Sequence, residues 1–400
     1  MARQLPVVEF VALMALLFSM VAFAIDAMLP GLPDIAQELT QADPNKAQLV
    51  VTAFMLGMGV GTFFAGPLAD AYGRRFITNI GLFIFVLGSF LAYIAPSLEL
   101  MLGARLFQGL GVAGARIAPL AMIRDLYEGR QMARITSFVT MVFMLVPAVA
   151  PSLGAVIINQ WNWRAIFIAF ILFAAVGFVW LNARQSETLA VPDRRPLRYG
   201  LLKAGIVEIA TNPQVVLHTA IMSLGFATLV AQLSSTLQIY AETFDRLASF
   251  PVWFGLTALL AMPATILNAM LVVRVGMRQM VRFAFAIQSV VSVAVVLLFL
   301  QSGQPIIALF PLWFFWSAVN LWTVGLTLGN LQALALGPLG HIAGLGASVT
   351  IAVSTIIAVV IGGAVGLAFN GTPIPLIISV ALLSVMALVL TWLSTGETKS

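Results

Sequence analysis

Long apolar stretches alternate with short polar ones along the whole chain. Twelve windows of roughly 20 residues are nearly free of charge, and this is the length of a helix that crosses the hydrocarbon core of a bilayer. The windows fall at about 7–29, 47–68, 77–95, 100–121, 136–158, 164–182, 214–236, 251–273, 281–300, 306–329, 344–369 and 375–393. The pattern predicts an all-α integral membrane protein with twelve transmembrane helices.

One polar segment, 184–212, is longer than the others and separates the windows into two sets of six. We therefore predict two six-helix halves, 1–183 and 213–400, joined by a cytoplasmic linker. A faint repeat supports this division, because Gly73 and Arg75 after the second window recur 203 residues later as Gly276 and Arg278. A parallel repeat of this kind is typical of transporters that bind substrate between their halves, near the membrane midplane.

Composition and charge agree with a membrane protein. Hydrophobic residues make up 61% of the chain and charged residues 9%, against about 45–50% and 25% in soluble domains. With the N-terminus inside, 15 of the 20 Lys and Arg residues fall on the cytoplasmic side, and only Lys46, Arg164 and Arg246 face out. This positive-inside bias explains the net charge of +5 without any nucleic acid.

The chain offers no sign of a metal site or a catalytic centre. It contains no cysteine and only two histidines, His218 and His341, so we expect neither a metal nor an enzyme. The first window ends in AFA at 22–24, which imitates a signal-peptide cleavage site. Because the window stays apolar to Leu29 and many similar windows follow, we interpret it as a first transmembrane helix.

The loop after the second window carries a dense motif. Residues 66–75 read GPLADAYGRR, which resembles the G-x-L-a-D-r-x-G-r-r signature of the major facilitator superfamily. Gly73 permits a tight turn, and Asp70 can pair with an arginine, such as Arg74 or Arg75, and cap a neighbouring helix N-terminus. We predict a latch that opens as the halves rock; an ordinary cytoplasmic turn is the alternative.

The fourth window places arginines inside the membrane. Residues 102–111 read LGARLFQGLG and resemble the superfamily motif in which a buried arginine, here Arg105, takes part in proton coupling. A guanidinium at this depth costs about 2.5–3.5 kcal/mol, so a partner or a wet cavity is expected; a purely structural ion pair is the alternative. The string GLGVAG at 109–114 matches G-x-G-x-x-G, but no strand precedes it, and close helix packing is the better interpretation.

The fifth window contains Pro147, Pro151 and Gly154 in the string VPAVAPSLG at 146–154. This string resembles, in variant form, the proline and glycine motif of antiporters in the superfamily. Such residues bend a helix and let it pack closely, which would keep the transport cavity closed when no substrate is bound. Generic helix kinks are the alternative.

These motifs converge on one group within the superfamily. Residues 26–36 read DAMLPGLPDIA, similar to the D-x-y-L-P-a-l-p-x-I-a signature of the bicyclomycin and chloramphenicol resistance antiporters. Further agreement lies in IRDL (123–126), WRAIF (163–167), ETL (187–189) and GLGAS (344–348). The resemblance implies a multi-pass protein of the bacterial inner membrane, with both termini cytoplasmic, that exchanges a drug for protons. Two departures are Arg116, where a small or apolar residue is expected, and a loose match in windows seven to nine.

Asp26 is the candidate proton carrier. It is the only carboxylate clearly inside a window, since Glu9 lies at the cytoplasmic end of the first one. At ~1.5 Å per residue, the depths of Asp26 and Arg105 agree within a few ångströms, so the two can pair. Moving Arg105 or changing hydration would then switch the protonation of Asp26. The alternative is that Asp26 caps the outer loop in water.

Substrate contacts are harder to predict. Arg116 lies eleven positions after Arg105, on the same helical face, and it either contacts an anionic or carbonyl-rich substrate or snorkels to the cytoplasmic interface. Polar and aromatic residues in other windows complete the candidate set, although packing or the interfacial belt explains each of them too. They are Phe23, Gln108, Gln232, Asn268, Trp316 and Asn320.

The function that we predict is proton-coupled antiport that exports small amphipathic, drug-like compounds by alternating access. No cofactor is expected beyond the proton gradient, and the expected partners are the substrate, protons and the lipid bilayer, with the protein a monomer. A superfamily importer that works by proton symport is the main alternative. It shares the loop motif and topology but does not explain the fifth-window and first-window resemblances.

Overall fold

Helices provide the regular structure of this protein in the computed structural model, which describes residues 5–194 and 196–394. No strand occurs within those ranges. In a bilayer every backbone N–H and C=O must be bonded inside the protein, and long helices satisfy this requirement within one segment. Two compact units divide the chain, Met1–Lys203 (unit 1) and Ala204–Ser400 (unit 2).

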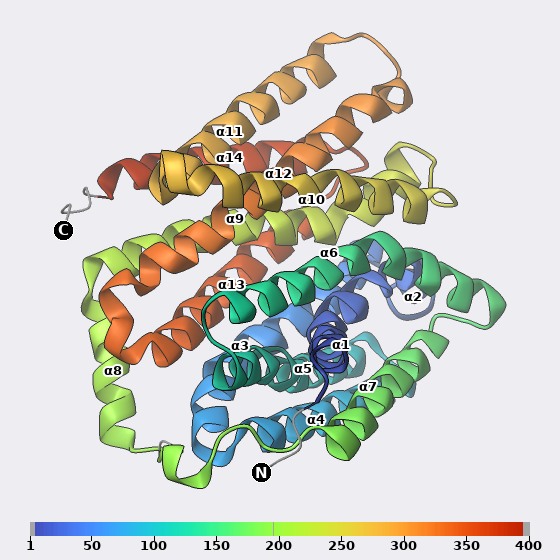
Figure 1. The fold of residues 1–400 in the computed structure, drawn as a ribbon. Helices are drawn as coiled ribbons and strands as arrows, with labels where there is room; N and C mark the ends of the chain where they lie inside the picture. The colour runs from blue at the N-terminus through green and yellow to red at the C-terminus, as the bar shows by residue number, and fades with distance from the viewer. Residues whose placement is uncertain (1–4, 195, 395–400) are drawn as a thin grey trace. The chain divides into compact units, whose positions relative to one another are not determined.

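Seven α-helices lie wholly within the described part of unit 1, and α2 is the short one among them (Figure 1). They are α1 Val7–Asp26, α2 Leu32–Leu39, α3 Leu49–Tyr72, α4 Arg74–Tyr93, α5 Leu98–Leu126, α6 Gly129–Gln160 and α7 Ala165–Arg184. Short 3₁₀ segments precede α2 and α3 and follow α7, at Leu29–Gly31, Pro44–Gln48 and Val191–Asp193.

Six long α-helices lie in the described part of unit 2. They are α9 Pro213–Gln238, α10 Phe250–Val275, α11 Met277–Gln301, α12 Phe310–Leu336, α13 Ala343–Leu367 and α14 Ile374–Leu393. A π-helical turn, Ile239–Thr243, continues α9. Short 3₁₀ segments lie before α12, at Ile306–Leu309, and between α12 and α13, at Gly337–Ile342.

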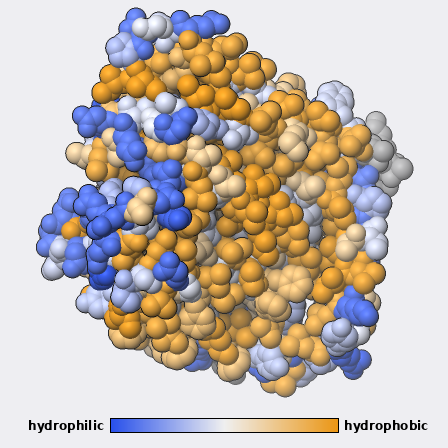
Figure 2. All heavy atoms as spheres, turned by 180° about the vertical axis from the view of Figure 1, so that it is seen from behind, coloured by the Kyte–Doolittle hydropathy of each residue, from blue (hydrophilic) through white to orange (hydrophobic). Residues whose placement is uncertain are grey.

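The long helices of the described residues agree in length and composition with the predicted membrane spans. Eleven stretches of the described residues are long and apolar enough to cross a bilayer, and one of them, Ile306–Leu367, contains both α12 and α13. Hydrophobic residues cover most of the face seen in Figure 2, with hydrophilic residues gathered toward its margins. Arg3, Arg195 and Lys399, three of the cations assigned to the cytoplasmic side, lie outside the described residues.

The segment predicted as a linker has structure of its own. It contains α8, Tyr199–Thr211, which the sequence pattern did not predict, and the boundary between the two units falls inside this helix. The limits 1–183, 184–212 and 213–400 stay predictions.

Glycines in α5 allow unit 1 to pack its helices closely. A Cβ on Gly109 would lie 2.0 Å from the Phe54 carbonyl oxygen of α3, and one on Gly111 would lie 2.5 Å from the Gly81 carbonyl oxygen of α4. Contacts this short leave no space for any side chain. The GLGVAG string therefore packs α5 between α3 and α4, which confirms the packing interpretation.

Candidate coupling and substrate-binding sites

The predicted latch begins with a sharp turn between α3 and α4. Gly73 has φ 109° and ψ 151°, a left-handed backbone conformation that favours glycine, and it ends α3 and precedes α4. Gly276 has φ 87° and ψ 149° and joins α10 to α11 in the same way. The repeat seen in the sequence is thus present in the backbone of both units.

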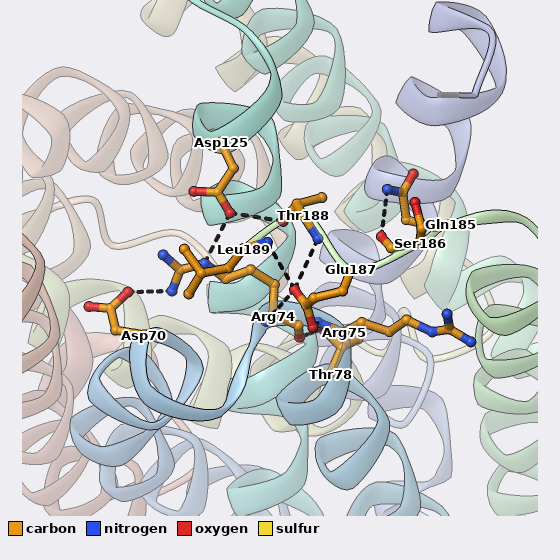
Figure 3. A network of polar contacts seen from close by, with 10 residues as sticks. All are labelled: Asp70, Arg74, Arg75, Thr78, Asp125, Gln185, Ser186, Glu187, Thr188 and Leu189. Atoms are coloured by element: carbon orange, nitrogen blue, oxygen red, sulfur yellow. Dashed lines mark hydrogen bonds and ion pairs between the residues drawn. The ribbon is translucent and has the colours of Figure 1, made fainter. Parts of the chain in front are cut away.

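Arg74 is the centre of a polar network at this turn (Figure 3). Its guanidinium contacts the Asp70 carboxylate and donates from Nε to Asp125 Oδ2 at 3.2 Å. The Asp125 oxygen also accepts from Thr188 Oγ1 at 2.8 Å. These contacts join the end of α3 and the start of α4 to the end of α5 and to the segment after α7, all within unit 1.

Glu187 caps the N-terminus of α4. Its carboxylate accepts from the backbone N–H groups of Arg74 at 2.9 Å and Arg75 at 3.1 Å (Figure 3). A negative charge here satisfies orphan donors and complements the helix dipole. We predicted that Asp70 pairs with an arginine and also caps a helix N-terminus. Its pair with Arg74 is present, whereas the carboxylate that caps α4 is that of Glu187. The motif string located Glu187 but gave it no role.

Arg75 forms a second set of hydrogen bonds between helices of unit 1. Its guanidinium donates from Nε and Nη2 to the Asn182 side-chain oxygen on α7, at 3.1 and 2.9 Å. Asn182 carries no signal in the sequence that marks it as a partner, because a lone amide near a helix end is common. The Arg75 side chain therefore lies beside the Arg74 network at the predicted latch, and its partner had to come from the structure.

Arg105 is fully buried and bonded to the backbone of two neighbouring helices. It donates to the Val50 carbonyl on α3 and to the Ala24 carbonyl on α1, both at 3.1 Å. Its third acceptor is the Gln108 side-chain oxygen at 2.5 Å, and its guanidinium lies 4.4 Å from the centre of the Phe54 ring. Partners for a buried cation were expected, and these contacts supply them.

Asp26 is the last residue of α1 and is 4% exposed. It is the one carboxylate among the buried side chains of the described residues, and it makes no hydrogen bond or ion pair to any of them. Pairing with Arg105 is therefore not formed in this structure. Arg105 instead bonds to the carbonyl of Ala24, one of the last four of α1, which lack partners within the helix.

Gly154 brings the antiporter motif next to Asp26. A Cβ on Gly154 would lie 2.1 Å from the carbonyl oxygen of Ala27, so the backbone of α6 touches the residue that follows the buried carboxylate. Pro147 and Pro151 lie inside the same continuous helix. Unit 1 thus assembles the buried acid, the buried arginine and the motif glycine at one end of α1.

Arg116 is partly buried on α5 and has few contacts. Its guanidinium donates from Nη1 to the Met58 sulfur at 3.7 Å, and it forms no ion pair with a carboxylate of the described residues. A thioether is a weak acceptor and does not neutralise charge. Arg116 therefore differs from Arg105, whose donors are taken up by carbonyl oxygens.

The remaining candidates in unit 1 are engaged with the protein. Gln108 is fully buried, bonds to Arg105 and donates to Ser89 Oγ at 2.7 Å. Phe23 packs against Phe170 and Phe173 of α7, with ring centres 5.4 and 5.0 Å away.

The candidates in unit 2 take part in buried polar contacts. Asn320 donates to the Gln232 side-chain oxygen at 2.6 Å, while its own side-chain oxygen is buried without a partner among the described residues. Trp316 donates from Nε1 to Ser292 Oγ at 2.9 Å. Asn268 accepts from Asn330 at 2.7 Å. The structure thus joins Gln232 to Asn320 and leaves Trp316 and Asn268 in separate contacts.

Within the described ranges, no group of three or more His, Asp or Glu side chains is close enough to hold an ion.

The fold, the glycine turn and the membrane arginine are the features of a transporter. The family model of the Major Facilitator Superfamily matches residues 12–350, and the chain belongs to this superfamily. It is 28% identical over 280 residues to a bicyclomycin resistance protein homolog of Haemophilus influenzae, covering 70% of each chain. It is 30% identical over 190 residues to multidrug resistance protein D of Escherichia coli K12, covering 48% of this chain and 46% of the relative.

A solved structure agrees with this assignment. The D-xylose-proton symporter has a TM-score of 0.74 at 15% identity and covers 98% of each chain, a likeness of fold alone. The predicted superfamily, its fold and the class of transporter rather than enzyme are therefore confirmed.

Proposed function

We propose that this transporter exports small amphipathic, drug-like molecules in exchange for protons. The observation that carries the proposal is Asp26, a buried carboxylate in a membrane helix without a hydrogen-bond donor or counter-charge among the described residues. An ionised carboxylate needs water, donors or a cation, whereas a neutral one tolerates apolar surroundings. Uptake and loss of a proton at Asp26 would therefore favour different arrangements of the helices around it.

Arg105 and Gly154 connect the surroundings of Asp26 to the other helices of unit 1, so a change in its protonation can affect them. Arg105 bonds the end of α1 to α3, and Gly154 lets α6 press against Ala27. We propose that a change in the hydration of Asp26 displaces one of these contacts. We propose that proton binding at Asp26 and substrate binding compete in this way, so that each promotes the release of the other.

The chemical class of the substrate rests on relatives and on Arg116. The relatives bear names of bicyclomycin and multidrug resistance proteins, which supports drug-like compounds. Arg116 lacks a carboxylate partner among the described residues, and we propose that it contacts anionic or carbonyl-rich groups of the substrate. Phe23, Gln108, Gln232, Asn268, Trp316 and Asn320 stay predicted contacts.

The proposed setting is the bacterial inner membrane. The relatives come from bacteria, and the excess of Lys and Arg in alternate loops supports cytoplasmic N- and C-termini. In this orientation, the network around Arg74 faces the cytoplasm and acts as the latch.

Proton flux in everted membrane vesicles tests the proposal. Respiration acidifies the vesicle lumen, and an exported substrate added outside should draw protons out of the lumen. Import by symport would instead carry protons inward with the substrate. Asp26→Asn keeps the size and hydrogen bonding of the side chain but removes the titrating charge, so proton release should disappear.

The matched control is Asp34→Asn, which makes the same change at an exposed carboxylate eight residues further along the chain. It should exchange at the wild-type rate. If Asp26→Asn still exchanges substrate for protons, Asp26 is not the carrier and the proposed mechanism is wrong.

A further inference from the structure

Unit 2 contains a small, partly open cavity that the transport mechanism does not use. It lies between α9, α11, α12 and α14, where α9 and α11 begin and α12 and α14 end, and its lining is largely apolar. Its polar lining comes from Arg278 and His218 together with Thr391 and Ser394. No carboxylate is among the lining residues in the described part of the chain.

Arg278 is the free cation of this cavity. It makes no hydrogen bond or ion pair to the described residues, and its Nε is buried without an acceptor. The nearby Arg282 is engaged, because it donates to the Thr391 carbonyl at 2.9 Å and lies 4.4 Å from the centre of the Trp392 ring. Arg278 as a whole is half-buried, but its buried Nε needs an acceptor, and the described part of the chain supplies none.

The internal repeat shows what this position lacks. Arg75 is the counterpart of Arg278 in unit 1, and Asn182 on α7 accepts its Nε and Nη2 donors. In unit 2 the polar side chains that line the cavity beside Arg278 are an imidazole and two hydroxyl groups, and none of them is an anion. His218 Nε2 shares a hydrogen bond with Ser394 Oγ at 3.1 Å, and Thr391 Oγ1 donates to the Leu388 carbonyl at 2.6 Å. The chemistry around Arg278 therefore suits an anion with several oxygens.

We propose that this cavity binds a phosphate group, from either an anionic phospholipid or free inorganic phosphate. Arg278 provides the charge, and the Ser394 hydroxyl and the His218 ring provide hydrogen bonds. The surroundings also suit a lipid. Trp392 is 68% exposed beside the cavity, and exposed Trp side chains of membrane proteins gather at the level of the headgroups. Under the proposed orientation this end of unit 2 meets the cytoplasmic leaflet, where anionic lipids attract basic side chains.

Binding measurements on the purified full-length protein test this proposal. The protein is prepared in phosphate-free detergent, and phosphatidylglycerol or inorganic phosphate is added in separate arms. Bound lipid is counted by native mass spectrometry, and stabilisation is followed by thermal unfolding. Arg278→Ala should raise the Kd of whichever of the two ligands binds the wild type by about fivefold. This is the loss of affinity expected when one cation near the membrane surface is removed. Arg274→Ala, an exposed arginine outside the cavity lining, should bind as the wild type does.

The two arms separate the sources of the phosphate group. Retention of phosphatidylglycerol that depends on Arg278 identifies a lipid site, and stabilisation by inorganic phosphate that depends on Arg278 identifies a site for the free ion. Equal binding by both arginine variants would overturn the proposal, as would no effect of either ligand on the wild type. If Glu397→Gln, outside the described residues, lowers the unfolding midpoint as much as Arg278→Ala before any ligand is added, the chain's own carboxylate is the partner and the proposal is wrong. None of these measurements depends on transport. A negative result here would therefore leave the proposal of proton exchange unaffected, and that proposal is tested by the vesicle assay.

Discussion

The contact between Gly154 and Ala27 makes a quantitative prediction about coupling. A Cβ at position 154 would lie 2.1 Å from the Ala27 carbonyl oxygen, whereas ordinary contacts begin at 3.4 Å. Gly154→Ala must therefore separate α6 from the end of α1 by about 1.3 Å, the difference between these two distances. Overpacking of this kind typically costs about 1–3 kcal/mol, and alanine recovers roughly 0.5–1 kcal/mol through its better helix propensity.

The functional loss should exceed the loss of stability. Ala27 follows Asp26 directly, so the shift displaces the proposed proton carrier, and a misplacement of about 1 Å costs as much as 100-fold in reactions that depend on position. We expect substrate-driven proton release in everted vesicles to fall at least about tenfold, while the unfolding midpoint in detergent falls modestly.

Gly103→Ala is the control, because a Cβ there meets nothing within 4 Å in the same unit. It should keep full exchange and unfold at the same temperature or higher. Wild-type exchange and wild-type stability in Gly154→Ala would refute the idea that the close approach of α6 serves coupling.

Three charged positions away from Asp26 give further single-residue tests. Glu187→Gln should destabilise the protein by about 1–2 kcal/mol in thermal unfolding, since the N-terminus of α4 loses its anion. Arg74→Ala should slow the rate of exchange in vesicles but leave the substrate Kd within about twofold, because the latch contacts only other parts of unit 1; unchanged transport with lost affinity would contradict this. Arg116→Ala should change the order of compounds in a susceptibility panel while substrate-driven proton release persists for neutral compounds. An equal loss for every compound would favour a role in folding instead.

The fold could be predicted because the bilayer imposes a length and a polarity on each helix. The window at 77–95 corresponds to α4, Arg74–Tyr93, and the window at 281–300 corresponds to α11, Met277–Gln301. Helix ends were less accurate, since helices continue beyond the apolar band; α6 begins at Gly129 rather than near 136. The helix α8 was missed because its charged residues and the prolines before it resemble a linker.

The site was predicted only in part, because the sequence gives the depth of a side chain in the membrane but not the direction in which it points from its helix. Asp26 and Arg105 were paired on depth alone, but the direction of each side chain around its helix also decides contact. Arg105 reaches backbone carbonyls of α1 and α3, and no sequence pattern reports a free carbonyl. Glycine was a better guide: the motif containing Gly154 predicted close packing, although its partner at Ala27 came from the structure.

The two glycine turns show that the backbone of the repeat is alike in both units. Gly73 and Gly276 share nearly the same backbone angles, because a left-handed turn tolerates few residues other than glycine. The side chains around them are not constrained in this way. In unit 1, Glu187 accepts from the start of α4 and Asn182 accepts from Arg75. In unit 2, Arg278 has no such partner among the described residues. Backbone geometry therefore preserves the repeat while its polar partners differ, and this difference is the basis of the anion site that we propose in unit 2.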